Sequence, residues 1–373
     1  MANIRQITAI QSSAVLASTI IGVGVLALPL FAVKAADAGA PLVTLLGMAL
    51  GYIGLYLITL LGIRFPNQSI VQYSEDIIGR WLAWVGSVAM IAFFAVITAL
   101  GAREFGEVVV TSVLKNTPLE VTVVVMLALA TISSRVNVTT FAYIHNFYFP
   151  LLLGPGFLIV ALSMKNADMI NLQPVWGNDP SGMVPGILTV AALFQGSFVM
   201  TLVIPAMRRP DRALQASFWG IFIAGSLYVS IVVAAVGVFG SEEIKHLLWP
   251  TLELAKATTL PANVLERLDA AFLAVWVTAV FTTLLSTNYL TIRMTTELFR
   301  LKDHNLFATF LLPVIFVMAL IPKNIFQMYA VIERVGRIGL AITIAYPGLL
   351  FVVALIRKKR GKRPNENAME PAR

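Results

Sequence analysis

The chain has 373 residues, of which 58% are hydrophobic and 12% are charged, whereas a soluble domain has about 25% charged residues. It has no cysteine, which excludes disulfides and thiolate metal sites, and its formal net charge is +8. Its apolar residues fall in runs of roughly 20, long enough to cross a bilayer, without the polar stripe of a soluble helix. The composition therefore predicts a polytopic, all-α membrane protein.

The first apolar run, Ile7–Val33, follows a basic residue and precedes AADA, as a signal peptide would. It is about twice as long as a signal-peptide core, so we interpret it as a retained helix. Its middle, Ser18–Pro29, reads STIIGVGVLALP. Glycine costs a helix about 1 kcal/mol and interior proline about 3 kcal/mol, and freed backbone groups are tolerated in lipid only where they line a protein cavity. We therefore expect this helix to be broken at Gly22–Gly24.

Nine further apolar runs follow the first. Each is expected to form a membrane-spanning helix, although the fourth and ninth are short. The ten predicted spans are Ile7–Val33, Pro41–Ile63, Leu82–Ala102, Leu119–Ser134, Val138–Met164, Met183–Met207, Ala213–Gly240, Ala270–Tyr289, Phe307–Ile321 and Ile338–Ile356.

Lysine and arginine residues are unevenly divided between the two sides of this arrangement. Of the 27, the side that holds both termini carries 17. Because positively charged flanks stay on the cytoplasmic side, both termini are predicted to be cytoplasmic. Residues 358–373 form a basic tail, which we interpret as a stop-transfer anchor rather than a site for nucleic acid or anionic lipid.

Three segments outside the spans are also expected to be structured. The segment NQSIVQYSEDIIGRW, between spans two and three, predicts a short amphipathic helix on the inner face. Residues 241–269 form the longest loop, whose Leu and Trp spacing favours a helix on the outer surface. Residues 323–339 fit either an outer interfacial helix or the first half of span ten.

Span six repeats the pattern of span one. The stretch Ala192–Pro210 has Gly196 in mid-span and Pro205 after an apolar half-turn. Matching interrupted helices in the two halves of a chain point to an inverted-repeat transporter fold. The alternative is that these residues are ordinary kinks or packing points. We predict a 5+5 LeuT/APC-like fold with discontinuous helices 1 and 6, in which residues 1–165 hold helices 1–5 and residues 166–357 hold helices 6–10.

The two breaks are the predicted ligand site. Half-helix N-termini attract a carboxylate, and freed carbonyls hold a cation or an ammonium group. Gln195 has both donor and acceptor capacity, although a helix–helix hydrogen bond worth about 1 kcal/mol is an equal alternative for it. Phe194 and Phe198 could line the pocket or simply face lipid. The predicted ligand-binding residues are Gly22, Val23, Gly24, Phe194, Gln195, Gly196, Ser197 and Phe198.

Polar residues at the ends of spans three and five are given structural roles. Arg103, Glu104 and Glu107 close span three and are interpreted as a self-paired helix end, with gating of an outer vestibule as the alternative. His145 is interpreted as an ordinary interfacial residue near the inner end of span five. The core would then hold almost no ionisable residue, which favours a sensor over a proton-driven pump.

Three stretches of the chain carry a family resemblance. They are HLLWPTLELAKATTLPANVLERLDAAFLAVWVTAVF at His246–Phe281, SSRVNVTTFAYIHNFYFP, and INLQPVWGNDPSG. Together they resemble the B subunits of bacterial spore germinant receptors, the GerAB-like family within the amino acid–polyamine–cation (APC) superfamily. The chain departs from the family pattern at Ser197 and Phe198, where an acidic residue often follows the glycine of span six.

The resemblance implies a location in the spore inner membrane, beside an A-type membrane subunit and a C-type lipoprotein. It implies a small-molecule germinant, most often an amino acid, and no nucleic-acid partner. In sodium-coupled relatives, hydroxyls on span eight meet carbonyls of broken span one and hold the ion. The corresponding candidates for ion or ligand contact are Thr282, Thr283, Ser286 and Thr287, although hydroxyls on a helix also bond their own backbone.

The sequence thus predicts a germinant-sensing subunit of a spore germination receptor. The alternatives are an ion-coupled amino-acid symporter of the APC superfamily and a purely structural membrane partner. No metalloprotease, P-loop or serine-hydrolase motif is present, so no enzyme is predicted. No metal and no cofactor is expected, apart from coupling to Na⁺ or H⁺ if the protein transports.

Overall fold

The computed structural model describes residues 6–177, 180–258, 268–301 and 304–361. In these residues the fold is all-helical, with a single isolated parallel β-bridge between Ile7 and Met207. The helices are α1 (Ala9–Ile20), α2 (Leu28–Ala36), α3 (Ala40–Arg64), α4 (Ile70–Ile78), α5 (Arg80–Ser112), α6 (Leu119–Ser133), α7 (Val138–Ser163), α8 (Met183–Ala192), α9 (Met200–Val203), α10 (Ala213–Ile244), α11 (Pro250–Ala257), α12 (Leu268–Leu298), α13 (His304–Leu320), α14 (Ile325–Leu340) and α15 (Tyr346–Ile356).

Six segments of the described chain are long and apolar enough to cross a membrane, and a seventh is a pair of helices bent by 41°. The protein is an integral membrane protein. Three shorter apolar helices, α1, α6 and α13, lie where spans one, four and nine were predicted. The total of ten spans, the inverted repeat and the division at residue 165 remain predictions. The six long segments are Leu28–Arg64, Arg80–Ser112, Val138–Asn166, Pro210–Ile244, Ala270–Leu298 and Ile325–Ile356.

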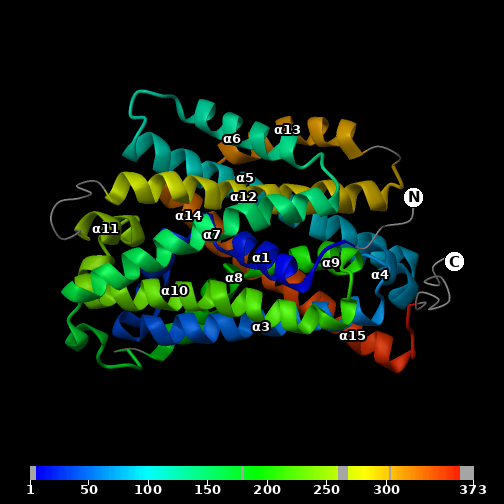
Figure 1. The fold of residues 1–373 in the computed structure, drawn as a ribbon, viewed down its shortest axis with the longest axis horizontal. Helices are drawn as coiled ribbons and strands as arrows, with labels where there is room; N and C mark the ends of the chain where they lie inside the picture. The colour runs from blue at the N-terminus through cyan, green and yellow to red at the C-terminus, as the bar shows by residue number, and fades with distance from the viewer. Residues whose placement is uncertain (1–5, 178–179, 259–267, 302–303, 362–373) are drawn as a thin grey trace, which may run out of the picture.

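Most of the helices run along the longest axis of the molecule (Figure 1). Helix α1 lies in the middle, in contact with α7, α10 and α12, and its residues Ser12–Ile20 are buried. Both ends of the described chain lie on one side, which we call the terminal side. There Ile7 pairs with Met207, and the Arg64 Nε donates to the Lys359 carbonyl at 2.6 Å. The opposite side, which carries α11, is called the distal side (Figure 1).

Spans one and six are both discontinuous, as predicted. Helix α1 ends at Ile20, and a short 3₁₀ turn at Val23–Val25 separates it from α2. Helix α8 ends at Ala192, and a second 3₁₀ turn at Gln195–Val199 separates it from the single turn of α9.

Small residues allow α3 to pack closely against the second broken span. A Cβ built on Gly47 would lie 2.6 Å from Val190 of α8, and one built on Gly51 would lie 2.7 Å from Phe194. Close packing of this kind is typical of helix pairs in membranes, where van der Waals contact replaces the hydrophobic effect.

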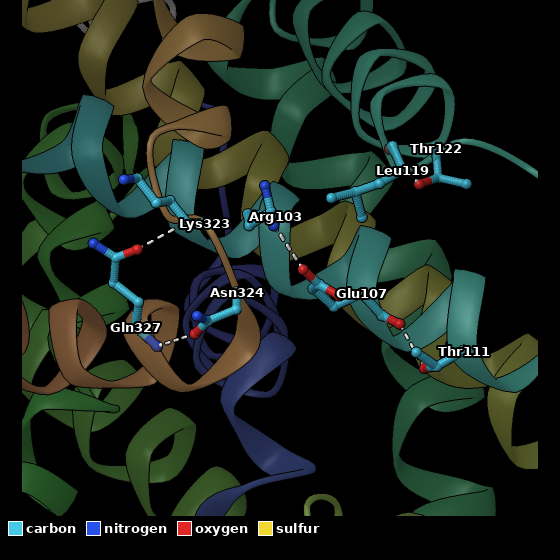
Figure 2. A network of polar contacts seen from close by, with 8 residues as sticks. All are labelled: Arg103, Glu107, Thr111, Leu119, Thr122, Lys323, Asn324 and Gln327. Atoms are coloured by element: carbon cyan, nitrogen blue, oxygen red, sulfur yellow. Dashed lines mark hydrogen bonds and ion pairs between the residues drawn. The ribbon is translucent and has the colours of Figure 1, made fainter.

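The segment 323–339 is the first half of span ten. Asn324 caps α14 by accepting a hydrogen bond from the Gln327 amide at 2.9 Å (Figure 2). Helix α14 then runs through a π-helical turn at Ala341–Ala345 directly into α15. Of the two alternatives for this segment, the structure has the first half of span ten, so the span begins at Ile325 rather than at Ile338.

The other segments outside the spans also differ in detail from expectation. The helix predicted between spans two and three is present as α4. In the loop 241–269, α11 is present, but its apolar face is buried against the protein, with Leu252 and Leu254 fully covered. Residues 259–267 of this loop lie outside the described residues, as does 362–373 of the predicted basic tail.

Candidate functional site

A cavity of about 110 Å³, called here the inner cavity, lies between the two broken spans. The first break contributes Val23 and Gly24, and the second contributes Gln195 and Gly196. A Cβ built on Gly196 would lie 3.0 Å from the Thr19 side chain, so the two breaks face each other. Six of the twelve predicted site residues line the cavity: Val23, Gly24, Gln195, Gly196, Thr283 and Thr287.

The remaining predicted ligand residues pack around the cavity instead of lining it. Gly22 is held against α12, where an added Cβ would lie 1.8 Å from the Thr283 Oγ1. The Phe194 ring lies 5.4 Å from that of Tyr228, and the Phe198 ring lies 5.2 Å from that of Phe94. Ser197 is buried in the same turn. These residues shape the cavity but do not contact its interior.

Hydroxyl groups of α12 meet the carbonyl groups at the end of α1. The Thr282 Oγ1 donates to the Ser18 carbonyl and the Thr283 Oγ1 donates to the Thr19 carbonyl, each at 3.0 Å. The last carbonyls of a helix have no partner within it, so these hydroxyls satisfy groups that the break would leave unpaired.

Two more hydroxyl groups donate hydrogen bonds to carbonyl groups at the first break. The Tyr228 hydroxyl on α10 donates to the Ile20 carbonyl at 2.6 Å. Beyond the break, the Thr251 Oγ1 on α11 donates to the Val25 carbonyl at 2.7 Å. The first break is therefore bonded to three other helices.

His145 lies inside the helix bundle, and its interpretation as an interfacial residue is wrong. Its side chain is fully buried, with Nδ1 2.6 Å from the Ser18 Oγ and Nε2 3.1 Å from the Ser286 Oγ. Ser286 also bonds the Thr19 hydroxyl at 2.7 Å. The imidazole thus joins α1, α7 and α12. A polar side chain inside an apolar span was the one sequence signal for this role.

Glu104 is the second ionisable residue whose place was mispredicted. It is only 4% exposed, lines the inner cavity and accepts a hydrogen bond from the Tyr329 hydroxyl at 3.2 Å. Together with His145, it overturns the expectation of a core almost without ionisable groups. The usable signal was the run of three valines at Val108–Val110, because it lets the helix continue past these charges: α5 ends at Ser112 and leaves Glu104 two turns inside the helix.

Of the self-paired helix end predicted on span three, the pairing of Arg103 with Glu107 is confirmed, but the helix does not end there, because α5 runs to Ser112. The Arg103 Nη2 lies 2.7 Å from the Glu107 Oε1, one turn along α5 (Figure 2). This pair leaves Glu104 without Arg103 as a partner, because Arg103 and Glu104 point in different directions on the helix.

Gln195 has one satisfied end and one unsatisfied end. Its Nε2 donates to the Gly336 carbonyl on α14 at 2.6 Å, which is the predicted helix–helix bond. Its Oε1 is buried and has no hydrogen-bond partner among the described residues. Buried polar atoms are nearly always paired, so a free acceptor beside the cavity points to a bound donor.

A larger cavity of about 630 Å³, called the distal vestibule, adjoins the inner cavity. Phe31, Thr189 and Glu333 line both cavities. Lys34, Lys245 and Arg337 line the vestibule. The Lys245 Nζ lies 2.7 Å from both Asp37 and Glu242, and these hydrogen bonds raise the pKa of Lys245. The vestibule therefore brings charged side chains next to the inner cavity, with which it shares three lining residues.

Comparison with protein families gives a match over most of the chain. The family described as spore germination protein matches residues 6–328. Spore germination protein YndE of Bacillus subtilis (strain 168) is 26% identical, over 96% of this chain and 98% of its own. Spore germination protein GerLB of Bacillus cereus is 23% identical, over 92% of this chain and 93% of its own.

Comparison with solved structures shows the fold of a transporter. MhsT in complex with L-phenylalanine has a TM-score of 0.70 at 13% identity, covering 95% of this chain and 90% of MhsT. A Na⁺-coupled sialic acid symporter has a TM-score of 0.61 at 11% identity, covering 95% and 80%. These relatives are germination proteins and transporters rather than enzymes.

Proposed function

The chain belongs to the family of spore germination proteins, and on that premise we propose that it is the germinant-sensing subunit of a spore germination receptor. The inner cavity is the proposed germinant site, and a small molecule such as an amino acid is the proposed germinant. The observation that carries this proposal is the meeting of both helix breaks at one cavity, with the Gln195 Oε1 unpaired among the residues that line it.

The hydrogen bonds between α1 and its neighbouring helices support signalling from this site. Helix α1 is bonded to α7, α10 and α12, and Tyr228 both lines the cavity and holds the Ile20 carbonyl. A ligand that shifts α1 would therefore shift its neighbours, because packed interfaces change between discrete arrangements rather than deform continuously.

The proposed receptor has further parts. We infer that an A-type membrane subunit and a C-type lipoprotein accompany this chain in the spore inner membrane. Both termini are proposed to be cytoplasmic, from the excess of Lys and Arg on the terminal side. The division into two inverted repeats, with a boundary near residue 165, is part of the same proposal.

The alternative function is an ion-coupled amino-acid symporter. It is favoured by the contact between the span-eight hydroxyls of Thr282 and Thr283 and the carbonyls of α1. Accumulation of labelled amino acid in liposomes, driven by a Na⁺ or H⁺ gradient, would support transport.

Deletion of the gene tests the proposed function. In a spore-former that lacks redundant receptors, we expect the deletion to abolish germination in response to at least one small nutrient, and a plasmid copy to restore it. Unchanged germination across a broad panel of amino acids and nucleosides would contradict germinant sensing.

A further inference from the structure

We propose that the inner cavity recognises the ammonium group of a small ligand, and that Glu104 on α5 provides the charge for it. This inference rests on the proposed function, because it names the chemical class of germinant for the same cavity. Ile97, Gly101 and Glu104 recur at helical spacing and all line the cavity, so one face of α5 forms a wall that ends in a carboxylate.

Hydrogen-bond acceptors are in excess around this cavity. A carboxylate accepts about four hydrogen bonds, and within the described chain Glu104 accepts one, from Tyr329. The Gln195 Oε1 accepts none there, although Gln195 is only 5% exposed. Leaving a buried acceptor unpaired costs about 1–3 kcal/mol. The cavity is therefore short of donors, and an ammonium group brings three N–H donors.

The charged residues that line the cavity also favour a ligand with an ammonium group. Among the described residues that line it, two are glutamates and none is lysine or arginine. Glu333 is paired with Arg337, which lines the vestibule and not the inner cavity. Glu104 has no ion-pair partner in the described chain. A buried carboxylate is costly without a positive partner, and a cationic ligand would supply one.

The size and walls of the cavity limit what carries the ammonium group. An apolar cavity of about 150 Å³ holds benzene, with six carbon atoms, so 110 Å³ suits a ligand of at most about six non-hydrogen atoms. Ile20, Leu100 and Leu284 are apolar parts of the wall. A small amino acid or a short alkylammonium fits these limits, whereas a long polyamine does not.

Two matched pairs of probes test the inference on the purified full-length chain. L-alanine and L-lactate differ only in an ammonium or a hydroxyl group, and propylammonium and propionate carry opposite charges on similar skeletons. By isothermal titration calorimetry, we expect the ammonium member of each pair to bind about thirtyfold more tightly, the effect of one buried charge pair.

Three variants assign this preference to Glu104. Glu104→Gln keeps the shape and the bond from Tyr329, and should weaken L-alanine binding about thirtyfold and erase the preference over L-lactate. Glu104→Asp should keep the preference at intermediate affinity. Glu253→Gln, at a half-buried side chain of α11 that pairs with Lys256, removes the same charge outside the cavity and should leave both L-alanine affinity and the preference over L-lactate unchanged. The thermal unfolding midpoint of each variant reports whether it is folded.

Several results would overturn the inference. They are binding of L-lactate or propionate as tight as that of its ammonium partner, a preference that survives in Glu104→Gln, and failure of both ammonium probes to bind. These outcomes are separable from failure of the proposed function. If the deletion strain stops germinating while the purified chain prefers L-lactate, only the ammonium inference is contradicted. If the deletion strain germinates normally while the purified chain prefers L-alanine, only germinant sensing is contradicted.

Discussion

The two helix breaks look alike in sequence but differ in how their backbone and side chains are satisfied. At the first break, the carbonyls of Ser18–Ile20 each accept a hydrogen bond from a hydroxyl on α10 or α12, and the Val25 carbonyl accepts one from Thr251. At the second break, the Gln195 Oε1 remains unpaired in the described structure. The backbone carbonyls of the first break are satisfied, whereas the second break leaves one buried acceptor unpaired on a residue that lines the cavity.

This difference separates two properties that a broken helix can provide. Satisfied carbonyls hold α1 in place and contribute stability, because buried polar groups are costly when unpaired. An unpaired acceptor lowers stability slightly but leaves a site for a ligand donor. Substitutions at the first break should therefore act mainly on folding and geometry, and those at the second mainly on ligand binding.

The largest effect is expected from Gly22→Leu. An added Cβ would lie 1.8 Å from the Thr283 Oγ1, and overpacking of this kind costs about 3 kcal/mol or more. We expect loss of the germination response while the chain still inserts into the membrane, measured by spore germination and immunoblotting of membranes. Gly196→Leu should also abolish the response, with a smaller loss of stability, because its nearest atom is the Thr19 methyl at 3.0 Å.

The control for these variants is Gly154→Leu on α7, where no atom lies within 4 Å of an added Cβ. Spores that carry this variant should germinate normally. Normal nutrient sensitivity in both Gly22→Leu and Gly196→Leu would place the germinant site elsewhere.

A smaller effect is expected from Tyr228→Phe. The substitution leaves the Ile20 carbonyl without its hydroxyl partner, which should lower the free energy of unfolding by about 1–3 kcal/mol. We expect a lower thermal unfolding midpoint and little change in L-alanine affinity, because the hydroxyl is directed at the backbone. Tyr56→Phe, at a side chain 42% exposed, is the control. A large loss of affinity without a loss of stability would make Tyr228 a ligand residue.

The smallest effect on stability is expected from Gln195→Met. The variant loses the bond to the Gly336 carbonyl but also removes the unpaired Oε1, so the net change should be under about 1 kcal/mol. The affinity for L-alanine should nevertheless fall about tenfold, the equivalent of one good hydrogen bond. On one preparation, the thermal unfolding midpoint measures the stability and isothermal titration calorimetry measures the affinity for L-alanine. Reduced stability with unchanged affinity would show that Gln195 only ties α8 to α14.

Local signals were sufficient for much of the fold. The apolar runs identified the membrane class, and the matching pattern of a mid-span glycine followed by a proline, at Gly22 and Gly196, marked both breaks. The start of span ten was left open between two alternatives, because the charges at Glu333–Arg337 fit both a surface helix and a self-paired turn of a span. In the structure Glu333 and Arg337 pair with each other, which allows the helix to continue.

The buried ionisable residues could not be placed in the same way. Glu104 and Glu107 are three residues apart on α5, yet one faces the inner cavity and the other pairs with Arg103. The residues next to His145 in the sequence do not distinguish a buried histidine from one at the membrane interface. Its burial depends on Ser18 and Ser286, which lie more than a hundred residues away.

By itself, the sequence determined the membrane class, the family resemblance and the positions of the two breaks, because each depends on residue type within one or two helical turns. Only the tertiary structure decided which groups meet at those breaks. Hydrogen bonds between α1, α7, α10 and α12 join residues far apart in the chain. The direction in which Glu104 points depends on the rotation of α5 against its neighbours, which packing sets and local composition does not.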